Sequence, residues 1–69
     1  MKILYSYYKN SNTNEYVKKL EVVESHFHGF PDYFYDLNGS LLGEDLTLVG
    51  FVPISKRKWD RMFVKTKKS

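Results

Sequence analysis

The chain contains no cysteine, so neither a disulfide nor a thiolate zinc site can hold its fold together. Its 69 residues make one domain at most, and a domain of this size buries only about 60% of the surface that its unfolded chain exposes. Stability must therefore come from bulky side chains, supplied by one tryptophan, six tyrosines and five phenylalanines. Homodimerisation would add buried area, and we keep a dimer as an alternative to a monomer.

No segment has the pattern of a membrane span or of a secretion signal. The longest uncharged stretch, 46–55, is far shorter than the roughly 20 apolar residues of a bilayer helix, and no apolar region with a cleavage site follows Met1. We expect a cytoplasmic protein. Lysine outnumbers arginine nine to two, which is typical of proteins encoded by AT-rich DNA. This excess of lysine suggests a phage or mobile-element protein that acts in the host cytoplasm.

The first half of the chain predicts a strand followed by a helix. Residues 2–8 are β-branched and aromatic on both faces, which is typical of a strand inside a sheet. Asn12 and Glu15 have the spacing of a capping box. Tyr16, Leu20, Val23 and Phe27 then recur at helical spacing, before Gly29 and Pro31 end the pattern. The sequence therefore predicts a helix over 13–28.

The middle of the chain predicts a hairpin and one further strand. Asn38-Gly39 lies between two short apolar runs, 33–37 and 40–42, and this dipeptide suits a two-residue type I′ turn. Residues 43–45 predict a second turn. The run 46–52 predicts another strand, and Pro53 removes a backbone donor at its end.

The last segment predicts a second helix that begins after Ser55. Trp59, Met62 and Phe63 lie at positions i, i+3 and i+4, so they would share one side of a helix and dock it onto the domain. Three cations at its start oppose the helix dipole. We therefore keep a last strand, or a segment ordered only by a partner, as alternatives.

These elements predict an α+β domain over 1–64 in the order β-α-β-β-β-α, with a frayed basic end at 65–69. The helices would pack on a mostly antiparallel sheet of three or four strands. The alternative fold is a small five-stranded β-barrel, in which 16–27 and 58–66 would be strands.

The charge of the chain is divided between two regions. Residues 1–55 carry four cations and seven acids, whereas residues 56–69 carry seven cations and one acid, Asp60. Such an asymmetry indicates an anionic partner for the basic end. The candidate anion-binding residues are Lys56, Arg57, Lys58, Arg61, Lys65, Lys67 and Lys68.

Aromatic side chains suggest two further candidate contacts with nucleic acid. Trp59 lies among the cations and could stack on an unpaired base, although its helical position favours docking into the core. Four tyrosines could likewise present their rings on an open sheet face, as in proteins that bind single-stranded RNA, but we expect a chain this short to need them in its core. They are Tyr5, Tyr7, Tyr33 and Tyr35.

Metal binding and catalysis have weaker support. His26 and His28 precede Asp32 and Asp36, but two residues apart on a helix they would project about 200° from each other and could not share an ion. No serine lies in a nucleophile-elbow sequence, and a domain this small has little volume for a substrate pocket. We expect no enzyme, no metal and no cofactor.

Two hypotheses for function remain. The first is a non-enzymatic module that binds nucleic acid through its basic C-terminal segment by releasing counterions, largely without regard to sequence. The second is a protein-interaction module that inhibits or regulates a host protein. In that case the cations would meet an acidic protein surface, or the acidic residues of 1–55 would imitate nucleic acid on a basic partner.

Overall fold

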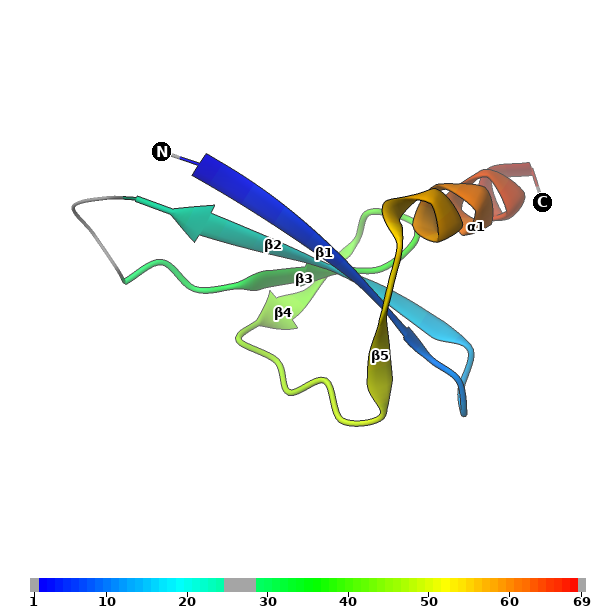
Figure 1. The fold of residues 1–69 in the computed structure, drawn as a ribbon, viewed down its shortest axis with the longest axis horizontal. Coiled ribbons are helices and arrows are strands. Elements are labelled where there is room, and N and C mark those ends of the chain that lie inside the picture. The colour runs from blue at the N-terminus through cyan, green and yellow to red at the C-terminus, as the bar shows by residue number, and fades with distance from the viewer. Residues whose placement is uncertain (1, 25–28, 69) are drawn as a thin grey trace.

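The structure, a computed structural model, describes residues 2–24 and 29–68. Within them the chain forms five strands and one helix (Figure 1). The strands are β1 (Lys2–Asn10), β2 (Glu15–Val23), β3 (Tyr33–Tyr35), β4 (Leu41–Glu44) and β5 (Phe51–Ile54), and the helix is α1 (Lys56–Lys68). All strand pairs are antiparallel, and the sheet has the order β4-β3-β2-β1-β5.

The predicted β-α-β-β-β-α order is wrong, because the segment predicted as the first helix contains β2. β2 pairs with β1 along its whole length, from Lys2 opposite Val23 to Asn10 opposite Glu15. A strand here places Lys18 on one face of the sheet and Lys19 on the other. The lysine ammonium groups lie over tyrosine rings on both faces, at 5.4 Å from the ring centroid of Tyr5 and 6.0 Å from that of Tyr8, so both faces accommodate a cation.

The polar run 10–14 forms a hairpin turn instead of a helix cap. The side-chain Oδ1 of Asn10 accepts hydrogen bonds from the backbone N–H groups of Asn12 and Thr13, at 2.9 and 3.3 Å. Asn14 has a positive φ of 60°, and its N–H donates to the Asn10 carbonyl at 2.7 Å. Asparagine favours turns through such local bonds, and here they connect β1 to β2.

The hairpin predicted around Asn38-Gly39 is present, but its turn is of another type. The Asp36 carboxylate accepts hydrogen bonds from the N–H groups of Asn38 and Ser40, at 2.8 and 2.9 Å, and the Gly39 N–H donates to the Asp36 carbonyl at 3.1 Å. Gly39 has a positive φ of 85°, whereas Asn38 does not have a positive φ. A type I′ turn requires positive φ at both central residues. Because only the glycine of this pair has one, the turn is not of type I′.

The segment predicted as a strand over 46–52 is mostly a loop, and β5 begins only at Phe51. Pro53 lies inside β5, which pairs with β1 at one edge of the sheet, where a missing N–H is tolerated.

The five-stranded barrel kept as the alternative fold is correct in predicting a strand over most of 16–27 but wrong in predicting one over 58–66, which is helical. Among the described strands β4 and β5 are the two unpaired edges, so the sheet does not close into a barrel.

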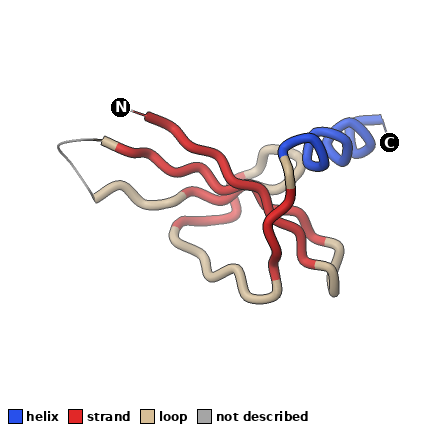
Figure 2. Tube along the Cα trace, in the orientation of Figure 1, coloured by secondary structure: helices blue, strands red, loops and turns tan. Residues whose placement is uncertain are grey.

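Each face of the sheet carries a small apolar cluster. α1 packs on one face through Trp59, which is 5% exposed and lies against Tyr7. On the other face Val17 and Phe34 are buried, and Leu46 of the loop 45–50 lies so close to Gly43 that an added Cβ would be 3.1 Å from its Cδ2. Figure 2 shows this loop joining β4 to β5, which leads directly into α1.

Candidate nucleic-acid interface

α1 begins at the predicted cap. The Ser55 Oγ accepts a hydrogen bond from the Lys58 N–H at 3.2 Å, and the Trp59 N–H donates to the Ser55 carbonyl at 3.1 Å. The first turn contains no acid, so its three cations face the positive end of the helix dipole. Because the cap and the docking of Trp59 hold the helix in place, this unfavourable charge is tolerated.

Asp60 partly offsets the charge at the start of α1. Its carboxylate accepts a hydrogen bond from the Lys56 Nζ at 2.8 Å, one helical turn away. This hydrogen bond, together with the charge of Asp60, raises the pKa of Lys56. Both side chains are well exposed, so the pair contributes little to stability. It does leave Lys56 less available to an external anion than the other cations of α1.

Four cations of α1 form a surface that we call the outer helix face. Arg57, Arg61 and Lys65 follow one another at intervals of four residues, and Lys58 lies beside them on the helix. All four are exposed, and among the described residues none of them forms an ion pair. Trp59 points to the sheet, so its docking directs these four side chains to solvent.

The sequence predicted further candidates besides these four cations. Lys67 and Lys68 belong to the last turn of α1, which extends to Lys68 through most of the region predicted to fray. Trp59 is buried against Tyr7, whereas stacking on a base requires an accessible ring face. His26 and His28 lie outside the described residues. In the part that the structure describes, no three acidic, histidine or cysteine side chains gather into a metal site.

Tyr5, Tyr7, Tyr33 and Tyr35 lie on the sheet face that carries α1, which we call the tyrosine face, whereas Tyr8 lies on the opposite face. Tyr7 is opposite Lys18 in the register of β1 and β2, and Lys18 is opposite Tyr35 in that of β2 and β3, so these residues project from one face. The Lys18 Nζ lies 5.4 Å from the ring centroid of Tyr5 and 5.9 Å from that of Tyr35. Two aromatic rings and one cation thus converge on an accessible surface.

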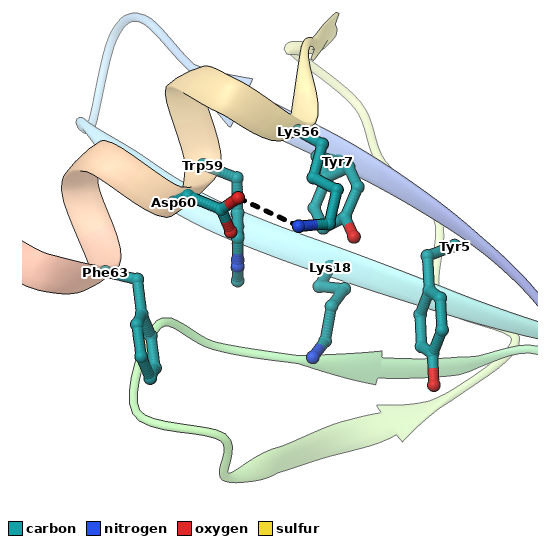
Figure 3. Close-up of a pocket in the computed structure, with 7 residues that line it drawn as sticks. All are labelled: Tyr5, Tyr7, Lys18, Lys56, Trp59, Asp60 and Phe63. Atoms are coloured by element: carbon teal, nitrogen blue, oxygen red, sulfur yellow. Dashed lines mark hydrogen bonds and ion pairs between the residues drawn. The ribbon is translucent and has the colours of Figure 1, made fainter.

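A pocket of about 270 Å³ lies between α1 and this face. Figure 3 shows its lining, with Tyr5, Tyr7 and Lys18 from the sheet and Lys56, Trp59, Asp60 and Phe63 from α1. A second pocket, of about 340 Å³, lies beside the hairpin turns and is lined by Glu15 and Asp36. Its acidic lining makes it the poorer site for an anion.

Sequence reasoning missed Lys18, because a helix over 13–28 removes it from the tyrosine face. Tyr16, Lys18, Leu20 and Val22 share one face of a strand, so only a strand prediction for this segment would have placed Lys18 on that face. The structure also places Lys9 over the ring of Tyr16, at 5.7 Å from its centroid, at the far end of the same face. Lysines beside tyrosines are therefore a repeated feature of this face.

No protein-family model, curated protein or solved structure was found to be similar to this chain. No helix among residues 2–24 and 29–68 has the length and apolar character needed to cross a bilayer. The assignment of function therefore rests on the geometry and charge of the two surfaces around α1.

Proposed function

We propose that this protein is a non-enzymatic module that binds nucleic acid, with the outer helix face contacting phosphates. One observation carries the proposal: the docked Trp59 turns four unpaired cations, Arg57, Lys58, Arg61 and Lys65, to the same side of an ordered helix. Cations fixed side by side neutralise neighbouring phosphates and release their counterions. Because they contact the backbone and not base edges, binding is largely independent of sequence.

The distribution of the acidic residues supports the same side of the molecule. Asp60 is the single acid of α1 and is bonded to Lys56. The Asp36 and Asp45 carboxylates accept hydrogen bonds from backbone N–H groups within the domain. The bond to Asp45 comes from the Asp32 N–H, at 3.0 Å. These two acids thus have partners within the domain, whereas the four cations of the outer helix face form no ion pair among the described residues.

A binding titration tests the proposal. Fluorescence anisotropy with labelled duplexes of unrelated sequence, at low salt, measures affinity for wild type and for a double variant, Arg57→Gln with Arg61→Gln. We expect the double variant to bind all sequences more weakly by a similar factor. The control, Lys2→Gln with Lys19→Gln, removes the same charge away from α1 and leaves the affinity close to that of wild type. Equal losses in both variants would contradict the proposed location.

A second candidate function is supported by the exposed apolar side chains around β4. Leu41 and Leu42 are 56% and 47% exposed, and Val49 in the following loop is 78% exposed. β4 is an edge strand of the sheet, and an edge strand that carries exposed apolar side chains favours a protein partner, as expected of a module that regulates a host protein. A pull-down from nuclease-treated lysate tests it, since a specific partner should be lost with Leu41→Lys and retained with Arg57→Gln and Arg61→Gln.

A further inference from the structure

We infer that the pocket between α1 and the tyrosine face receives an unpaired base of a single-stranded nucleic acid. The inference rests on the proposed function, because the outer helix face supplies the general phosphate affinity. It adds a second contact, made by the residues that line the pocket, and a preference for single strands over duplexes.

Tyr5 is the residue that offers a ring to such a base. It is 50% exposed, whereas Tyr7, the next tyrosine of the same face, is half-buried beneath Trp59. Figure 3 shows Tyr5 and Phe63 at opposite ends of the pocket, with the ammonium group of Lys18 between them. An exposed aromatic residue of this kind can stack on any base, since every base has a π-face.

Lys18 places a positive charge beside that ring. Its Nζ is 5.4 Å from the Tyr5 centroid, so the cation and the stacking surface belong to one site. The other charged groups of the pocket are Lys56 and Asp60, which are hydrogen-bonded to each other at 2.8 Å. The pocket therefore holds one net positive charge, which complements the single charge of one phosphodiester linked to the stacked base.

The volume of the pocket is compatible with a small ligand. At about 270 Å³ it lies just below the usual range of small-molecule sites, roughly 300–1,000 Å³, which suits one nucleotide unit and not a larger cofactor. A base within a duplex is stacked on its neighbours and has no free face, and extruding it costs a few kcal/mol. A ligand that must insert one ring is consequently bound better as a single strand.

Anisotropy titrations at one fixed salt concentration test the inference. The probes are a labelled oligothymidylate of twelve nucleotides, the same strand paired with oligoadenylate, and free thymidine monophosphate as competitor. Tyr5→Leu removes the ring and keeps a strand-forming residue at an exposed position. Tyr16→Leu is the matched control, because Tyr16 also lies beside a lysine of this face but does not line the pocket.

We expect wild type to prefer the single strand and Tyr5→Leu to bind it about 5- to 150-fold more weakly, the range measured for one base stacked on an aromatic ring. Duplex binding should change less than about two-fold, and Tyr16→Leu should behave as wild type. Fluorescence of Trp59, the single tryptophan, should change when the oligonucleotide fills the pocket, and circular dichroism confirms that each variant is folded.

The remaining outcomes separate this inference from the proposed function. Equal binding of single strand and duplex, unaffected by Tyr5→Leu, would overturn the pocket as a base site while leaving phosphate binding by α1 intact. No binding of either oligonucleotide would overturn the proposed function itself. Thymidine monophosphate could also displace the labelled oligonucleotide at the concentration at which the oligonucleotide itself binds. That result would assign the pocket to free nucleotides and overturn the inferred preference for single strands.

Discussion

The rings of Trp59 and Tyr7 lie with their centroids 5.4 Å apart and their planes tilted by 42°. This contact joins α1 to β1 and orients every other side chain of the helix. Trp59 is one of only three apolar residues that are buried among the described residues, so the position of the basic surface depends strongly on this aromatic contact. Stability and binding should therefore change together when this contact is altered.

Replacement of Trp59 by alanine should unfold most of the molecule. Truncating a buried tryptophan typically costs about 3–5 kcal/mol, and a domain this small has a total stability of a similar size, roughly 3–5 kcal/mol. Trp59→Phe keeps an aromatic ring against Tyr7 and should cost less. Thermal unfolding followed by circular dichroism at the helix band measures both. A Trp59→Ala protein that melts at the temperature of wild type would contradict the docking described here.

Replacement of Gly39 by alanine should lower the free energy of unfolding by about 1 kcal/mol. Gly39 has a φ of 85°, and an added Cβ would have no neighbour within 4 Å, so the cost arises from backbone conformation alone. Gly39→Asn should cost less, because asparagine tolerates the left-handed region. Urea denaturation of the three proteins gives the comparison, and an alanine variant as stable as wild type would show that the turn adopts another conformation.

Neutralisation of Asp60 should strengthen binding to nucleic acid. Asp60→Asn removes the one acid of α1 and releases Lys56 from its ion pair, and a charge change at an exposed site is typically worth 0.2–1 kcal/mol, or about 1.5- to 5-fold in affinity. Glu15→Gln, an acid exposed at the start of β2, is the control and should have little effect. Anisotropy with one duplex measures both, and weaker binding by Asp60→Asn would place the phosphates elsewhere.

The C-terminal helix could be predicted from the sequence because its signals agree with its packing. Ser55 provides the cap, Trp59 and Phe63 recur at helical spacing, and both face the pocket against the sheet. The separation of Trp59 from the solvent-facing cations follows from that spacing alone. Local pattern and tertiary contact indicate the same structure here, so the prediction of the helix is confirmed.

The error at β2 has the opposite cause. Tyr16, Leu20 and Val23 fit one stripe of a helix, yet the same residues also fit a strand in which both faces are covered. What decides between them is pairing with β1 over nine positions, a non-local interaction that outweighs local periodicity. A strand also places Lys18 and Lys19 on opposite faces of the sheet, where tyrosine rings accommodate them, which the sequence pattern alone does not reveal.

The dependence of affinity on salt tests the central proposal most directly. For duplex DNA the logarithm of the binding constant falls with the logarithm of salt concentration by about 0.9 per neutralised phosphate. With Arg57, Lys58, Arg61 and Lys65 in contact, wild type should show a slope of about −3.6 between about 50 and 200 mM salt. The Arg57→Gln and Arg61→Gln double variant should be shallower by about 1.8. Wild-type binding that is indifferent to salt, or a double variant with an unchanged slope, would contradict the role of the outer helix face.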